Sequence, residues 1–165
     1  MAMHIGAPAK PVVKAGDLLK VSQLIAEAGG FVSAPIHASV SGKVMRLDDI
    51  IVSGGQRIPA VVIGSDGMAE HWKGIAPPPV SDMESFLNAV RNSGVVGLGG
   101  AGFPTMVKLK VNPKSVEALI INGAECEPYI TSDTRTKFQG YTQAGIVCIR
   151  MILHSHLNDG TVCYP

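Results

Sequence analysis

Residues 71–105 read HWKGIAPPPVSDMESFLNAVRNSGVVGLGGAGFPT, and this stretch divides the chain into two parts. Near its start are three consecutive prolines, which keep a chain extended and stiff, so we predict a Pro-rich linker over 73–80. After the prolines, apolar residues recur at helical spacing: Met83, Phe86, Leu87 and Val90. The stretch ends in a loop with four glycines in six positions, over 97–102.

Signals for the start and end of a helix bracket the periodic segment. Ser81 and Glu84 have the S-x-x-E spacing of a capping box, in which each side chain bonds the backbone of the other residue. Gly94 supplies a C-terminal stop. These signals predict an amphipathic helix over Asp82–Ser93.

The sequence before the linker is typical of β-structure. Short apolar runs rich in Val and Ile are separated by Gly, Pro and Asp, and they cover 11–13, 17–27, 31–47 and 59–64. Strands at this spacing favour a small all-β barrel or sandwich, which we place at 1–72.

After the glycine loop, VEALII at 116–121 is a candidate buried strand, and apolar residues within 134–156 have helical spacing. Alternating helices, loops and strands indicate the start of an α/β domain over 81–157, followed by an atypical tail at 158–165. We therefore expect a two-part α+β fold, with a β-domain first and a partial α/β domain second.

Composition excludes several classes of function. The net charge is +1, so we expect no nucleic-acid partner. No apolar run reaches the roughly 18–20 residues of a membrane span, and no signal-peptide core is present. Three widely spaced cysteines without a C-x-x-C motif predict neither a disulfide framework nor a metal site. Charged residues make up 16%, against about 25% in ordinary domains, which favours a protein with contact faces for partners.

The glycine loop is the first candidate binding site. Its glycines, Gly97, Gly99, Gly100 and Gly102, permit a backbone that turns N–H groups toward phosphate oxygens. Because the loop follows a helix and lacks GK[ST], it is neither the dinucleotide fingerprint nor the Walker motif. Phosphate binding and a purely structural turn both remain open at this point. Lys108 follows closely and is either a phosphate ligand or a solvated lysine.

A second candidate site follows the predicted strand at 116–121. Asn122, Glu125 and Glu127 would lie at the carboxyl end of that strand, where ligands gather in open α/β sheets. Their amide and carboxylate groups suit hydrogen bonds to ribose hydroxyls, although a solvated turn is the simpler alternative. We expect no nucleophile at Cys126, because the flanking carboxylates disfavour its thiolate.

The two motifs together resemble a known family. GLGGAGFPT, followed by INGAECEP and YITSD, is similar to the RnfC subunit of the Rnf electron-transport complex, and related motifs occur in the flavin- and NADH-binding subunit of respiratory complex I. The β-rich segment KPVVKAGDLLKVSQLIAEAGGFVSAPIHASVSGKV resembles the barrel-sandwich hybrid domain that opens the RnfC subunit. The resemblance covers residues 4–150.

The resemblance implies a flavin site. Gly97, Gly99, Gly100 and Gly102 would line FMN, and Lys108 would contact the flavin or its phosphate. Asn122 would hydrogen-bond the isoalloxazine edge, and Glu125 and Glu127 would face the flavin and the nicotinamide ribose of NADH. The cofactors supply the hydride chemistry, and protein groups orient them, so no catalytic residue and no metal ligand is predicted.

The resemblance also implies a context. It places the chain in a membrane-associated NADH–ferredoxin oxidoreductase, peripheral on the cytoplasmic side, with the other subunits and ferredoxin as partners. The chain departs from the family in two ways: Ala124 replaces an acidic residue of the complex I motif, and the cysteine ligands of the family's iron–sulfur clusters are absent. We therefore expect a truncated chain that is inactive by itself.

Two other classes of function remain open. The β-domain also resembles lipoyl and biotinyl carriers, but its turn at 29–35 has no lysine to modify. The alternative to a flavoprotein is thus a non-enzymatic docking module built on a lipoyl-like barrel.

Overall fold

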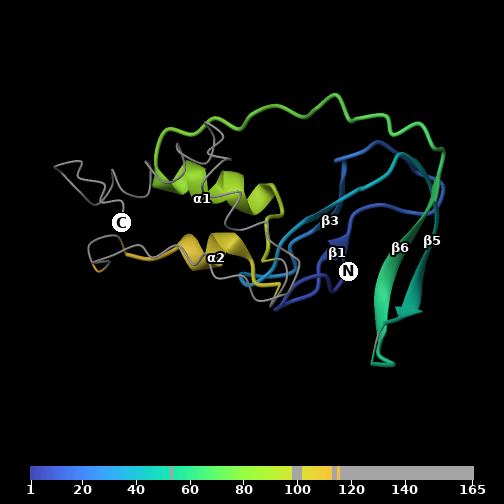
Figure 1. Ribbon diagram of the computed structural model, residues 1–165, viewed down its shortest axis with the longest axis horizontal. Coiled ribbons are helices and arrows are strands. Elements are labelled where there is room, and N and C mark those ends of the chain that lie inside the picture. Colours follow the sequence, from blue (N-terminus) through green and yellow to red (C-terminus); the bar gives the residue numbers. More distant parts are fainter. Residues whose placement is uncertain (53, 98–101, 113–114, 116–165) are drawn as a thin grey trace, which may run out of the picture. The chain divides into compact units, whose positions relative to one another are not determined.

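The computed structural model describes residues 1–52, 54–97, 102–112 and 115. The chain divides into two units, Met1–Lys110 and Val111–Pro165, and the first unit holds all the elements described below (Figure 1). In chain order they are β1 (Lys10–Pro11), β2 (Leu18–Leu19), β3 (Leu24–Glu27), β4 (Ile36–His37), β5 (Gly42–Ile51), β6 (Arg57–Ser65), α1 (Met83–Asn92) and α2 (Thr105–Leu109).

The described strands form two antiparallel three-stranded sheets, ordered β1-β3-β4 and β2-β5-β6. Each apolar run predicted from the sequence contains strand residues, so the β-rich first part is confirmed. Both sheets contribute to one buried cluster: Leu19, Ile25, Ala38 and Val44. Alternation along β2 shows why, because Leu18 is 75% exposed while its neighbour Leu19 is 2% exposed.

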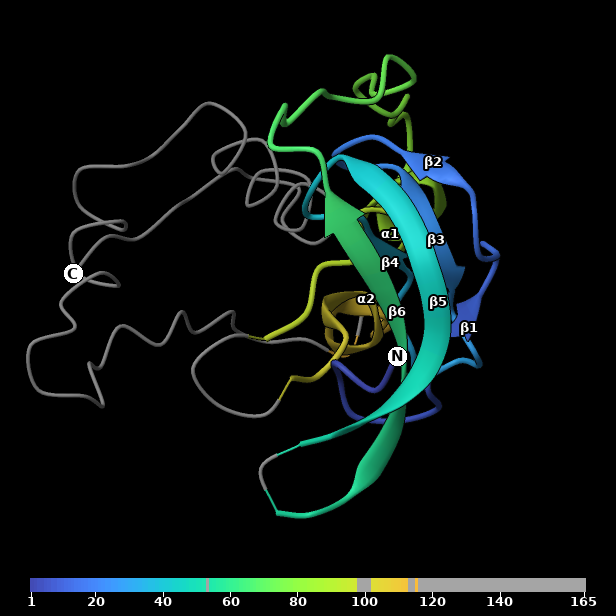
Figure 2. The same ribbon diagram turned by 90° about the vertical axis from the view of Figure 1, so that its right-hand side faces the viewer.

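Strands β5 and β6 form a long curved hairpin (Figure 2). Its register runs from Gly42 opposite Ser65 to Ile51 opposite Arg57, with a bulge between Val44 and Arg46. Several large apolar side chains of β5 are exposed: Met45, Leu47, Ile50 and Ile51. The hairpin is therefore held mainly by its own ladder rather than by burial on both faces.

Helix α1, Met83–Asn92, confirms the helix predicted over 82–93. Phe86 is its buried residue, as the apolar spacing indicated. Gly94 has a φ of +69° directly after the C-cap Ser93, which is the left-handed conformation that ends a helix.

The N-terminal cap of α1 differs from the prediction by one residue. Asp82 is the N-cap, and its side chain accepts a hydrogen bond from the Ser85 N–H at 2.7 Å while the Ser85 hydroxyl meets the Asp82 backbone. The predicted box between Ser81 and Glu84 is therefore wrong. Asp and Ser are comparable N-caps, so sequence alone does not decide between adjacent candidates.

Helix α2 was not predicted, because five residues are too few to show a helical period. The predicted linker, 73–80, is exposed and contains neither helix nor strand. The strand expected at 116–121, the helix expected within 134–156 and the tail lie outside the described residues. No helix in the described part of the chain is long and apolar enough to cross a membrane.

Candidate functional site

The two ends of the glycine loop are joined by a short antiparallel pairing, which we call the loop neck (95–97 with 103–105). The Gly97 N–H donates to the Phe103 carbonyl at 3.0 Å, and the Thr105 N–H donates to the Val95 carbonyl at 3.0 Å. A β-bridge between Val96 and Pro104 lies between these bonds. Gly97 and Gly102 are thus brought together at the base of the loop, as binding of one ligand by both ends requires.

Elements on both sides fix the neck. The neck begins just after the left-handed Gly94 that ends α1, and α2 begins at Thr105. Pro104 is fully buried and is the N-cap of α2, and Met106 on α2 is 5% exposed. The loop therefore connects two helices whose nearest turns are anchored by burial.

The N-terminal segment contacts the neck from outside. The Ile5 N–H donates to the Gly102 carbonyl at 2.8 Å. A Cβ on Gly102 would lie 3.3 Å from the Met3 carbonyl oxygen and 3.4 Å from the His4 Cα. Gly102 thus leaves room for this segment, which is a packing reason for glycine beside the predicted ligand role.

Lys108 brings a positive charge to the neck. It is exposed on α2, and its Nζ lies 6.0 Å from the centre of the Phe103 ring, at the limit of a cation–π contact. Lys110, two residues further on, has its Nζ 5.0 Å from the Phe31 ring centre. Each lysine is therefore associated with an aromatic ring, but only Lys108 is associated with a residue of the neck.

The described part of the chain contains three predicted site residues, Gly97, Gly102 and Lys108. The other predicted site residues lie outside the described residues: Gly99, Gly100, Asn122, Glu125 and Glu127. The contact of the N-terminal segment was not predicted, since nothing in MAMHIGAPA indicates a contact with a loop so far along the chain.

A histidine lies near the end of α1. His37 on β4 is half-buried, and loss of hydration on burial lowers the pKa of its imidazole. Its Nδ1 would lie 3.4 Å from a Cβ on Gly94. A ring that burial keeps neutral fits a packing role beside the end of the helix.

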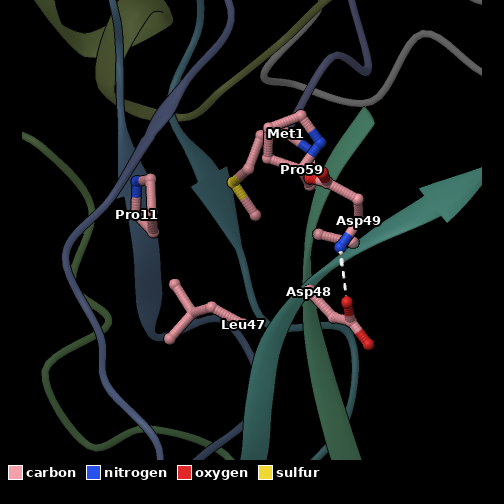
Figure 3. Close-up of a pocket in the computed structure, with 7 residues that line it drawn as sticks. Met1, Pro11, Leu47, Asp48, Asp49 and Pro59 are labelled. Carbon is pink, nitrogen blue, oxygen red and sulfur yellow. Dashed lines mark hydrogen bonds between the residues drawn. The ribbon is translucent and has the colours of Figure 1, made fainter. Parts of the chain in front are cut away.

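A hollow of about 350 Å³ opens beside the β5–β6 hairpin and holds none of the predicted site residues (Figure 3). It is lined by Met1, Pro11, Leu47, Asp48, Asp49, Pro59 and Ala60. The Met1 ammonium group donates to the Pro59 carbonyl at 2.6 Å, and burial lowers the pKa of that group. A hydrogen bond from Arg46 lowers the pKa of Asp48. Within the described residues no group of three or more side chains could hold a metal ion.

Comparison with known proteins defines both parts of the chain. Residues 1–68 match the RnfC barrel sandwich hybrid domain, and residues 90–156 match the Nuo51 FMN-binding domain. The second match includes the loop neck, α2 and all the predicted site residues. The chain is therefore an Rnf-type barrel sandwich sequence followed by a flavin-domain sequence.

Relatives that align with most of the chain agree with these matches. The chain is 47% identical over 137 residues to the RnfC-type subunit of the Na⁺-translocating ferredoxin:NAD⁺ oxidoreductase complex of Acetobacterium woodii, covering 81% of this chain and 31% of the relative. It is 44% identical over 160 residues to the proton-translocating counterpart of Clostridium ljungdahlii, covering 92% of this chain and 34% of the relative. It is also 44% identical over 139 residues to the corresponding subunit of the ion-translocating oxidoreductase complex of Pseudomonas aeruginosa, covering 81% and 18%.

The chain belongs to the RnfC family. It spans about a third or less of the length of these relatives.

Proposed function

We propose that this chain is the flavin-binding part of an RnfC subunit that transfers electrons between NADH and ferredoxin. The loop neck carries the proposal, because it holds Gly97 and Gly102 together within the segment that matches an FMN-binding domain. The fold we propose is α+β, with a barrel-sandwich hybrid domain at 1–72, a linker at 73–80, and a partial α/β domain at 81–157.

In this proposal the glycine loop provides the phosphate and ring cradle. Gly97, Gly99, Gly100 and Gly102 let backbone N–H groups approach the FMN phosphate without steric hindrance from a Cβ. Lys108 adds a charge-assisted contact to the same phosphate, or to the flavin, from α2. When bound, FMN accepts a hydride from NADH and passes single electrons toward iron–sulfur clusters on other parts of the complex.

The second motif orients the flavin and the nicotinamide. Asn122 hydrogen-bonds the edge of the isoalloxazine ring, and Glu125 and Glu127 accept hydrogen bonds from the flavin and from the NADH ribose. Protein groups in this site bind and align the two cofactors, so that the hydride travels a short distance.

The whole complex supplies the remaining partners. We propose that this chain works beside the other subunits of an ion-translocating complex, peripheral on the cytoplasmic side of the membrane, with ferredoxin as the electron partner. The names of its relatives support this assignment, since each is the corresponding subunit of a complex of this kind.

The test is an FMN titration of this chain, followed by flavin fluorescence. We expect saturable binding that weakens on Gly100→Val and on Asn122→Ala. Lys108→Gln is expected to weaken binding roughly tenfold, because it removes a charged hydrogen-bond donor. Lys110→Gln is the matched control, because it also removes an exposed lysine beside a phenylalanine, and it is expected to leave the affinity unchanged.

Two other results would change the proposal. If a longer chain that includes the rest of the relatives' length binds FMN and this chain does not, the site needs residues that this chain lacks. If neither binds FMN, the flavin assignment fails.

A docking module is the second candidate, and the exposed apolar side chains of β5 favour it: Met45, Leu47, Ile50 and Ile51. Stable co-purification with the other subunits, in material that contains no flavin, is the result that would select it.

A further inference from the structure

The N-terminal segment, Met1–Ala9, is fixed at several points before it reaches the loop neck. Its start is held by the Met1 ammonium group on the Pro59 carbonyl, and Figure 3 shows Met1 beside Pro59. Further along, the Ala7 N–H donates to the Val32 carbonyl at 2.9 Å, and the Ser33 hydroxyl donates to the Ala7 carbonyl at 2.8 Å. Between these anchors, Ile5 donates to Gly102.

His4 fixes the part of the segment nearest the neck. Its Nε2 accepts a hydrogen bond from the Ala34 N–H at 3.1 Å, and its Nδ1 lies 3.1 Å from the Ile5 carbonyl oxygen. The neutral ring with its proton on Nδ1 satisfies both bonds at once. Nε2 also lies 3.0 Å from the Ala34 carbonyl, so a protonated ring would donate there instead. The imidazole thus has a partner on Ala34 in either charge state.

Ala34 is a firm anchor for this ring, because it is 3% exposed and Ser33 beside it is 1% exposed. The backbone of His4 in turn lies against Gly102. A displacement of His4 would therefore move both the His4 Cα that contacts Gly102 and the Ile5 N–H that bonds its carbonyl.

We infer that His4 is a positioning residue for the flavin site. It does not reach the flavin but holds the N-terminal segment on the turn at 32–34, and the segment holds the Gly102 end of the loop neck. This inference rests on the proposed flavin function, and it adds a residue outside the segment that matches the FMN-binding domain.

The test compares three variants in the same FMN titration, with thermal unfolding of the flavin-free protein measured in parallel. His4→Ala removes the ring and is expected to weaken FMN binding roughly three- to tenfold, the range for the loss of one or two neutral hydrogen bonds. His4→Gln restores most of the affinity, because its Oε1 can accept the Ala34 N–H. His71→Ala is the control, since His71 is exposed and its imidazole has no hydrogen bond in the described part of the chain. It should leave the affinity within about twofold.

Amide hydrogen exchange provides a readout that does not need flavin. In the unliganded chain, the Ile5 and Gly97 amides should exchange faster in His4→Ala than in His71→Ala, because these two N–H groups bond Gly102 and Phe103.

Two results overturn the inference: His4→Ala lowers the thermal midpoint and leaves FMN affinity and Gly97 exchange unchanged, or His4→Gln behaves like His4→Ala. If the wild-type chain binds no FMN, the proposed function fails separately, and Gly97 exchange alone decides whether His4 positions the neck. Faster exchange in His4→Ala then supports the positioning role, and unchanged exchange contradicts it.

Discussion

The β5–β6 hairpin and the loop neck are both antiparallel pairings, but they are held in different ways. The hairpin keeps a register from Gly42 to Ile51 against β6 and belongs to a sheet. The neck has a single bridge between two hydrogen bonds and depends on Ile5 for an outside contact. A short pairing with few contacts has low local stability, so the proposed flavin loop can be disturbed without unfolding the sheets.

The largest effect is expected in the core that joins the two sheets. Leu19→Ala should lower the free energy of unfolding by about 3 kcal/mol, because it leaves a cavity at a side chain that is 2% exposed. Leu18→Ala, at the exposed neighbouring position, should change it by less than about 0.5 kcal/mol. Urea denaturation measures both values.

The same pair of leucine variants separates the two regions. Under conditions where Leu19→Ala is fully folded, its FMN affinity should equal that of the wild type, because the neck is not part of that core. A weakened affinity in the folded Leu19→Ala chain would show that the neck and the sheets act as one unit.

A smaller effect is expected where the N-terminal segment passes the turn at 32–34. Gly6 has a φ of +101°, and a Cβ there would lie 2.0 Å from the Val32 carbonyl oxygen. Gly16 has nearly the same φ, +97°, with no atom within 4 Å of its Cβ position. Both alanine variants carry the backbone strain of a positive φ, and only Gly6→Ala adds the clash.

We therefore expect Gly6→Ala to cost about 2 kcal/mol more than Gly16→Ala, as overpacking does elsewhere. Gly6→Ala should also accelerate amide exchange at Gly97, and Gly16→Ala should not. Equal losses of stability in the two variants would mean that the segment can move away from Val32 without consequence.

The smallest effect concerns the helix that leads into the neck. Asp82→Ala removes the cap of α1 and should lower the thermal midpoint slightly, whereas Ser81→Ala should not. The hydrogen bond from the Ser85 backbone lowers the pKa of Asp82 below its usual value of 3.8. The contribution of this carboxylate is therefore complete above pH 3.8 and is lost as the pH falls through the lowered pKa.

Thermal unfolding between pH 7 and pH 2 checks this third expectation. The difference in midpoint between the wild type and Asp82→Ala should shrink toward the acid end. A larger loss for Ser81→Ala than for Asp82→Ala would return the cap to the residue that the sequence pattern favoured.

The features that could be predicted from the sequence are those set by neighbouring residues. The apolar period of α1 and the stop at Gly94 are local signals, and both are confirmed. The cap was misplaced by one residue because Ser81 and Asp82 are both good caps, and the choice depends on backbone geometry. Helix α2 is shorter than the window in which a period can be recognised.

The glycine loop was found from its composition, but its support was not. The bond from Ile5 to Gly102 joins segments that are far apart in the sequence, and such contacts leave no periodic pattern. The glycine at position 6 was the available signal, since a left-handed glycine often marks a close backbone approach. That signal does not name the partner, and the close approach is to Val32.

The most direct test of the flavin assignment is amide hydrogen exchange of this chain with and without saturating FMN. We predict slower exchange in peptides that cover 97–108 and 122–127, and no change in peptides from the β5–β6 hairpin. Saturable FMN binding that protects other segments and leaves 97–108 unchanged would contradict the assignment.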